Sequence, residues 1–245
     1  MQAKSNQWNN NLAFLLAATG SAVGLGNIWG FPYKAGENGG GLFVLLYMFF
    51  VVVLGLPVFM AEVFIGKKGK ANPVSAVENL AKSSNSSRSW NLVGYSGILA
   101  SLLIAGYYAV IAGLVINYGF ISLAGFGELD PAVVYATEVS SFWEMTFWFS
   151  LFLVGSGIVV GFGIDKGIES AMRILLPMLF VLVLLLVGYG AIKGDMPSAL
   201  NYLFSWKADQ FNAGTIQAAV GQAFFSLSIG MGPLMAFGSY MPKNQ

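Results

Sequence analysis

Three glycines and an asparagine interrupt the first long apolar stretch of this sequence, residues 12–37. The interruptions are Gly20, Gly24, Gly26 and Asn27, with Pro32 shortly after them. Because glycine and proline disfavour a continuous helix, we predict that a membrane-spanning helix begins here and breaks between residues 22 and 27. A break at membrane depth leaves backbone groups unpaired, which is costly unless buried protein or a bound species satisfies them. The stretch is therefore a candidate binding site.

A second apolar stretch, residues 213–240, is interrupted in the same way. Small polar residues, two glycines and a proline cluster in its middle, over residues 226–233. Two interrupted spans five helices apart are the sequence pointer to an inverted-repeat transporter with a site at the bilayer midplane.

Two other interpretations of the first stretch deserve weight. Gly20 and Gly24 are four residues apart, a spacing that also serves close packing of two membrane helices without any ligand. The glycines do not follow the G-x-G-x-x-G spacing of nucleotide-binding loops, and no strand precedes them. Helix packing stays open as an alternative, whereas nucleotide binding is discarded.

The composition is that of an integral membrane protein. Of the 245 residues, 56% are hydrophobic and only 9% are charged. The balance of 12 basic and 11 acidic residues argues against nucleic acid as a partner, because phosphate backbones need a basic surface. The absence of Cys and His removes thiol and histidine catalysis and zinc sites, so we expect no enzyme here, and any bound metal should be a hard, oxygen-liganded ion.

The elements that must position these residues are six predicted transmembrane helices, which make an all-α polytopic fold in the lipid bilayer. Their ranges are 12–36, 41–66, 90–124, 143–163, 170–192 and 213–240. Nine Lys and Arg residues fall on one side of such a topology and three on the other. Because cytoplasmic loops are enriched in positive charge, we expect a cell-membrane protein with both ends of the chain in the cytoplasm.

Three further features carry expectations. Glu62, in the second span, either lies near the cytoplasmic interface or faces the interior with a partner, and its position near the basic cluster at 67–70 favours the interface. A short surface helix is predicted over residues 74–82. The adjacent Tyr107 and Tyr108 lie deep in the third span, where a hydroxyl needs a hydrogen-bond partner, either a ligand or a neighbouring backbone.

The motifs along the chain resemble the neurotransmitter:sodium symporter family, most closely its bacterial amino-acid members of the leucine-transporter type. They span the chain in the family's order: residues 20–29 (GSAVGLGNIW), 31–33, 37–41, Asn72-Pro73, Tyr107-Tyr108, residues 167–169 with Pro177, residues 221–228 (GQAFFSLS) and Ser239-Tyr240. The resemblance implies sodium-coupled uptake of an amino acid by alternating access.

The resemblance also implies a role for individual residues. Two sodium ions are expected, one on the carbonyls of Gly20 and Val23 and the other on Ala22, Asn27 and Ser226. The substrate site would comprise Ala22, Gly24, Leu25, Gly26, Ile104, Tyr108, Phe225, Ser226, Ser228 and Met231. In it, the amides near Leu25 and Gly26 would hold the substrate carboxylate with the Tyr108 hydroxyl, and Phe225 would form an aromatic lid.

Substrate class and ion dependence follow the same resemblance. Relatives that carry monoamines have an acidic side chain where this chain has Gly24, so the substrate is expected to bring its own carboxylate. An apolar or aromatic amino acid is expected from Ile104 and its apolar neighbours. Tyr47, Gln222 and Ser226 resemble part of the family's chloride site, but chloride dependence stays open. The oligomeric state is open as well.

The chain departs from the family in three places. Gly30 replaces the usual arginine after the tryptophan, and Ser5 replaces the basic residue before Trp8, with Lys4 as a possible substitute. Family members have eleven or twelve spans, so residues 1–245 are expected to be a fragment of one transmembrane domain. Residues 1–192 would be the first five-helix repeat, and residues 193–245 an outer loop and the first helix of the second. The alternative is a non-transporting membrane module that needs a partner or the missing half.

Overall fold

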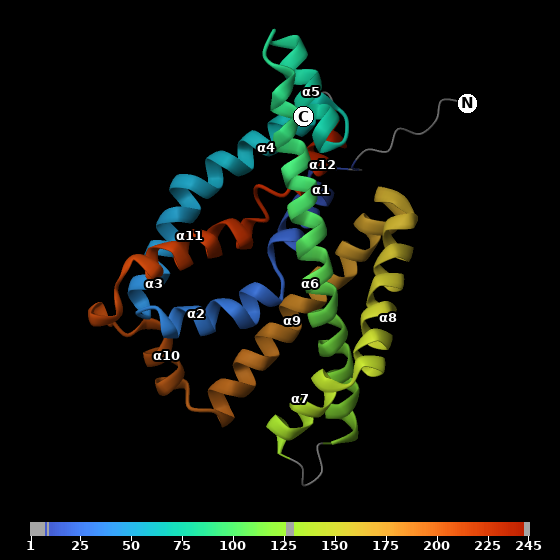
Figure 1. Cartoon of the computed structure of the whole chain (residues 1–245). Helices are drawn as coiled ribbons and strands as arrows, with labels where there is room; N and C mark the ends of the chain where they lie inside the picture. The colour runs from blue at the N-terminus through green and yellow to red at the C-terminus, as the bar shows by residue number, and fades with distance from the viewer. Residues whose placement is uncertain (1–7, 9, 126–129, 243–245) are drawn as a thin grey trace.

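The computed structural model describes residues 8, 10–125 and 130–242, and these residues are predominantly helical. Within them β geometry is confined to one isolated bridge between Gly40 and Trp206, which confirms the predicted all-α class. The longest helices, α6, α8 and α9, lie in the middle of the chain, between the two breaks (Figure 1). In chain order the helical elements are α1 (Asn11–Ala22), η1 (Gly26–Gly30), α2 (Phe31–Glu37), α3 (Gly41–Phe50), η2 (Val51–Gly55), α4 (Leu56–Gly69), α5 (Pro73–Ser83), η3 (Arg88–Trp90), α6 (Asn91–Ala124), α7 (Pro131–Ser140), α8 (Phe142–Gly161), η4 (Ile164–Glu169), α9 (Ser170–Lys193), α10 (Met196–Phe204), η5 (Ala208–Gln210), α11 (Ala213–Leu227) and α12 (Pro233–Ser239).

Four continuous helical runs are long and apolar enough to cross a membrane. They are Gly41–Gly69, Arg88–Ala124, Phe142–Gly161 and Lys166–Lys193. A fifth crossing is available if the bent pair Asn11–Ala22 and Gly26–Glu37 counts as one span. The sixth expected span, 213–240, consists of two short helices, α11 and α12, so six crossings remain a prediction while the multi-pass membrane fold is confirmed.

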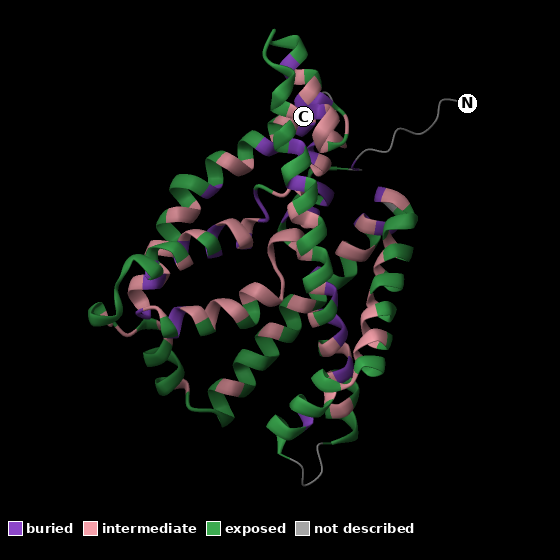
Figure 2. Cartoon of the chain, viewed as in Figure 1, coloured by how far each residue is buried: buried purple, intermediate pink, exposed green. Residues whose placement is uncertain are grey.

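The outer faces of these helices are apolar and uncovered. In α9, Leu184, Leu185 and Leu186 are 69%, 64% and 67% exposed, and Figure 2 shows that exposed residues run along most of α6, α8 and α9. Such surfaces would be unfavourable in water, because apolar area is stabilised by removal from it. They suit lipid or further protein in a membrane.

Two small cores join the broken helices to the rest of the fold. Trp8 packs with Phe14 of α1 and Phe237 of α12, and its indole N–H donates to the Phe237 carbonyl over 2.9 Å. In the other core, Ala35 of α2 is buried with Phe43 of α3 and Ala219 of α11. The second half of each broken span is therefore fixed by contacts with neighbouring helices.

The predicted surface helix is confirmed as α5, which Asn72 caps by accepting a hydrogen bond from the Ser75 backbone N–H.

The preferred placement of Glu62 was wrong in one respect: its side chain faces the interior, is 3% exposed and accepts a hydrogen bond from the Gly230 N–H. The physical reason is that the break after α11 leaves a backbone donor that α12 cannot satisfy, and the Glu62 carboxylate satisfies it.

Candidate functional site

The candidate site lies where the two predicted helix breaks meet. α1 ends at Ala22 and the helix resumes at Leu25 in a direction that differs by 51°. α11 ends at Leu227, and residues 228–232 form turns before α12 begins. Gly230 and Gly232 have φ values of 80° and 91°, a conformation that side chains disfavour, which explains why glycines occupy the second break.

Serine side chains join the breaks to each other and to α6. The Ser228 hydroxyl donates to the Ser21 carbonyl over 2.7 Å, a bond between residues 207 positions apart. The Ser101 hydroxyl of α6 donates to the Met231 carbonyl over 2.7 Å. These bonds satisfy carbonyls that the interrupted helices leave unpaired, and they hold the two breaks side by side.

A cavity of about 250 Å³ lies between the breaks. Its lining is mostly small or apolar, with polar atoms supplied by the backbone of the first break and by a few side chains. The lining residues are Gly20, Ser21, Ala22, Val23, Gly24, Asn27, Ile104, Tyr108, Phe225, Ser228 and Met231. We call it the inner cavity. No residue in this lining is charged at neutral pH.

An oxygen-rich cluster of side chains borders the inner cavity. The Ser226 hydroxyl donates to Asn27 Oδ1 over 2.8 Å, and the Asn27 amide N–H donates to the Ala22 carbonyl. Gln222, which is 1% exposed, donates from Nε2 to Ser226 Oγ over 3.3 Å and to Asn27 Oδ1 over 3.5 Å. Carbonyl, amide and hydroxyl oxygens from both broken helices thus converge at one point.

Tyr108 and the glycines around it define the wall of the inner cavity. The Leu25 backbone N–H donates to the Tyr108 hydroxyl oxygen over 3.0 Å, so the hydroxyl proton remains available to another acceptor. A Cβ at Gly24 would lie 2.6 Å from Tyr108 Oη, and one at Gly26 would lie 2.0 Å from Phe225 Cε1. Both glycines therefore permit close approach of an aromatic ring to the break.

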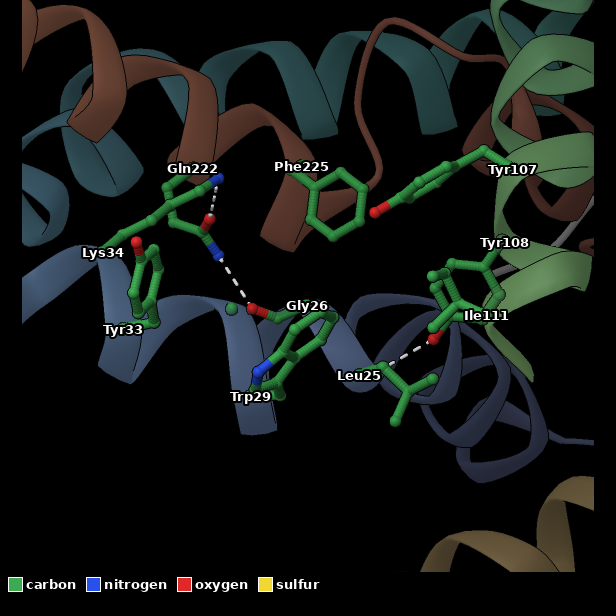
Figure 3. A pocket seen from close by; sticks show the side chains of 11 residues that line it. Leu25, Gly26, Trp29, Tyr33, Lys34, Tyr107, Tyr108, Ile111, Gln222 and Phe225 are labelled. Carbon is green, nitrogen blue, oxygen red and sulfur yellow. Dashed lines mark hydrogen bonds between the residues drawn. The ribbon is translucent and has the colours of Figure 1, made fainter. Parts of the chain in front are cut away.

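A second cavity, of about 330 Å³, lies on the other side of Phe225 and Tyr108, which line both spaces. Aromatic rings dominate it, as Figure 3 shows for Trp29, Tyr33 and Tyr107. We call it the outer cavity. Its one charged lining residue is Lys34, whose ammonium group donates to Gln222 Oε1 over 2.9 Å.

The structure brings the predicted site residues together. Ten of the residues predicted to bind substrate or sodium line the inner cavity. They are Gly20, Ala22, Val23, Gly24, Asn27, Ile104, Tyr108, Phe225, Ser228 and Met231. Leu25 and Gly26 line the outer cavity, and Ser226 lies in the oxygen cluster. Gly20 also packs closely, because a Cβ there would meet the Met172 sulfur at 2.5 Å, so the helix-packing interpretation holds alongside the cavity.

Sequence reasoning missed other members of the site. The Ser21 carbonyl and the Lys34 ammonium bond to Ser228 and Gln222, which are 207 and 188 positions away, so no local pattern indicated them. Of the expected chloride residues, Gln222 and Ser226 are hydrogen-bonded, whereas the Tyr47 ring packs on Phe31 with centroids 4.8 Å apart.

Comparisons with known proteins give the family. The model of the sodium:neurotransmitter symporter family matches residues 5–131 and 135–245. The uncharacterized sodium-dependent transporter YhdH of Bacillus subtilis is 32% identical over 248 residues, covering 100% of this chain and 54% of that protein. The human sodium-dependent neutral amino acid transporter SLC6A17 is 28% identical, over 95% of this chain and 36% of its own length.

A solved structure, that of MhsT in complex with L-phenylalanine, has the same fold. Its TM-score is 0.88 at 38% sequence identity, over 98% of this chain and 55% of that chain. The chain thus spans about half the length of the bacterial relative and of the solved structure. The paired broken helices, the oxygen cluster between them and the match over nearly all residues lead to one assignment: this chain belongs to the sodium:neurotransmitter symporter family, a family of membrane transporters and not of enzymes.

Proposed function

We propose that this chain forms the substrate- and sodium-binding half of a symporter that takes up an apolar or aromatic amino acid. The observation that carries the proposal is the inner cavity, which is lined by residues of both broken helices, with polar side chains among them. Half-helices that end at a midplane cavity bind anionic groups at their N-termini and cations at their carbonyl ends.

The cation chemistry favours sodium, which is cargo in this mechanism. The Ala22 carbonyl, Asn27 Oδ1 and Ser226 Oγ already lie within hydrogen-bonding distance along one chain of contacts, so small rotations would direct all three oxygens at one ion. Gly20 and Val23 also line the inner cavity, and their carbonyls would serve a second ion. Neutral oxygens of this kind replace the hydration shell of a monovalent cation.

The anion chemistry favours a substrate carboxylate. The Tyr108 hydroxyl has an acceptor role toward Leu25 and retains its proton, which it can donate to a carboxylate beside the amides of Leu25 and Gly26. Gly24 leaves no room or charge for an acidic side chain, since a Cβ there already crowds Tyr108. The carboxylate must therefore come from the solute.

The side-chain pocket favours an apolar solute. Ile104, Phe225 and Met231 line the inner cavity together, and methionine adapts to side chains of several sizes. Two relatives are consistent with this class: MhsT was solved with L-phenylalanine, and SLC6A17 is named a neutral amino acid transporter.

Sodium coupling supplies enough free energy for accumulation. One sodium ion moving down a tenfold gradient releases about 1.4 kcal/mol, and a potential of about 100 mV adds about 2.3 kcal/mol. Two ions would provide about 7 kcal/mol, which supports about a 10⁵-fold accumulation of a net-neutral solute.

We place both ends of the described chain in the cytoplasm, on the basis of the asymmetry in Lys and Arg.

The test is uptake of radiolabelled amino acids by proteoliposomes that contain the product of the full reading frame. We expect accumulation of L-phenylalanine or a similar apolar amino acid only under an inward sodium gradient, and we expect the Asn27→Ala variant to lose it. Uptake that is unaffected when potassium replaces sodium would refute the proposal. Vesicles made with only these 245 residues separate a transporter from a module that depends on a partner, because only the former would accumulate solute.

A further inference from the structure

Lys34 stands out among the residues that line the two cavities because it alone is charged. It lies on α2, is partly buried, and belongs to none of the ion pairs found in the described part of the chain. Its recorded partner is the neutral side-chain oxygen of Gln222, at 2.9 Å. An ionisable side chain within a membrane-spanning segment is costly and usually marks a functional role.

Gln222 connects Lys34 to the oxygen cluster. While Oε1 accepts from the ammonium group, Nε2 donates to the Gly26 carbonyl over 3.3 Å, and also to Ser226 Oγ and Asn27 Oδ1. Figure 3 shows this path from Lys34 on α2, through Gln222 on α11, to Gly26 at the first break. One amide therefore joins the outer cavity to the proposed ion site.

Lys34 determines which way this amide points. An ammonium group can only donate hydrogen bonds, so it requires the oxygen of Gln222 on its own side and the NH₂ group on the side of the cluster. The reverse orientation would set the NH₂ group against the ammonium and Oε1 against the Gly26 carbonyl and Asn27 Oδ1, both of them acceptors. Three unfavourable contacts would replace favourable ones.

We infer that Lys34 is a positioning residue for sodium: through Gln222 it fixes the oxygens of Asn27 and Ser226 in the arrangement that receives the ion. The inference rests on the proposed function of the oxygen cluster. Lys34 does not touch the cluster itself, so it acts through the Gln222 amide. Removing it should weaken sodium binding while leaving the amino-acid pocket intact.

Gly30, the neighbouring position along α2 and η1, cannot take over this role. Gly30 lies four residues before Lys34, one helical turn away, and also lines the outer cavity, but it has no side chain and no heavy atom lies within 4 Å of where its Cβ would be. An arginine at this position would have room to enter the outer cavity. In the described part of the chain, the cation that reaches Gln222 comes from Lys34.

The experiment is a sodium titration of radiolabelled L-phenylalanine binding to the full-length protein in detergent. For Lys34→Met, which keeps the length of the side chain and loses the donor, we expect the sodium concentration at half-maximal binding to rise about tenfold. The amino-acid affinity at saturating sodium should change less than twofold. Lys34→Arg should restore the wild-type sodium response, because the guanidinium also donates only.

Two further variants keep the test specific. Lys193→Met removes the same charge from an exposed position at the end of α9 and should leave the sodium response unchanged. Gln222→Leu should itself weaken sodium binding, and adding Lys34→Met to it should have no further effect, because the path through the amide is already absent. Independent, multiplicative effects of the two substitutions would overturn the inference.

The outcomes separate this inference from the proposed function. A wild-type protein that binds no amino acid in a sodium-dependent way refutes the proposed function, and the inference with it. Sodium-dependent binding by the wild type with an unchanged sodium response in Lys34→Met overturns the inference alone. Equal weakening of sodium and amino-acid binding in a variant of lowered melting temperature would also overturn it, since that result indicates a general loss of structure.

Discussion

Replacing Gly26 with alanine places a methyl group in the face of Phe225. The new Cβ would lie 2.0 Å from Cε1, 2.9 Å from Cδ1 and 3.0 Å from Cζ of the ring. Carbon atoms in contact are about 3.5–4.0 Å apart, so the ring must move by about 1.5 Å or more. Because Phe225 separates the inner and outer cavities, that movement reshapes the proposed amino-acid pocket.

The size of the effect follows from the cost of overpacking. Forcing extra volume into a packed site costs about 1–3 kcal/mol, which corresponds to a loss of about 5- to 150-fold in affinity. The assay is equilibrium binding of L-phenylalanine at saturating sodium, with thermal unfolding in parallel to show that the variant is folded. We expect weaker binding and a lowered melting temperature in a variant that still unfolds in one cooperative transition.

Gly30→Ala is the matched control, because Gly30 ends the same turn of helix, lines the outer cavity and has no heavy atom within 4 Å of its Cβ position. Alanine there should leave binding within about twofold of the wild type, within the usual range for a surface substitution. A Gly26→Ala/Phe225→Leu double variant should lose less than the sum of the two single changes, since the smaller side chain relieves the clash. Equal affinity in Gly26→Ala and Gly30→Ala would refute the reasoning.

Three further predictions concern single contacts. Tyr108→Phe removes the hydroxyl proposed to hold the carboxylate and should weaken amino-acid binding by about tenfold, the value of about 1.4 kcal/mol expected for one such hydrogen bond; unchanged binding in an equilibrium assay would exclude that role. Glu62→Ala leaves the Gly230 N–H without its acceptor and should lower stability by about 1–3 kcal/mol in thermal unfolding, whereas Glu62→Gln, which retains an acceptor, should lose less. Hydrogen bonds from the Ser198 hydroxyl and backbone N–H lower the pKa of Asp195. The ionised Asp195 carboxylate therefore stabilises α10 fully above the ordinary pKa of aspartate, and this stabilisation is lost as the pH falls through the lowered pKa. In Ser198→Ala, hydrogen exchange of α10 should show the loss at a higher pH, and an unchanged pH dependence would contradict this prediction.

The sequence predicted the breaks because their cause is local. Glycine, proline and small polar residues at 20–27 and 226–233 disfavour a continuous helix whatever surrounds them. The structure ends α1 at Ala22 and α11 at Leu227, within or beside those predictions. The long apolar helices were predicted for the same reason, since length and hydropathy alone decide whether a segment can cross a bilayer.

The contacts that tie the breaks together were not predictable in this way. Glu62 reaches Gly230, and Lys34 reaches Gln222, across separations of 168 and 188 residues. The sequence places Glu62 in the second apolar span but does not indicate the direction of its side chain, which depends on how α4 and α12 pack. The sequence also gave no sign of the π-helical turns at Gly26–Gly30 and Val51–Gly55, whose geometry depends on neighbouring helices as well as on their own residues.

The central claim is that the two breaks together bind an amino acid with sodium. Its most direct test is equilibrium binding of L-phenylalanine to the purified full-length protein while sodium replaces potassium at constant ionic strength. We predict saturable binding that requires sodium and that Asn27→Ala shifts to much higher sodium concentrations. Binding of equal strength in potassium, or the same sodium response in Asn27→Ala as in the wild type, would contradict it.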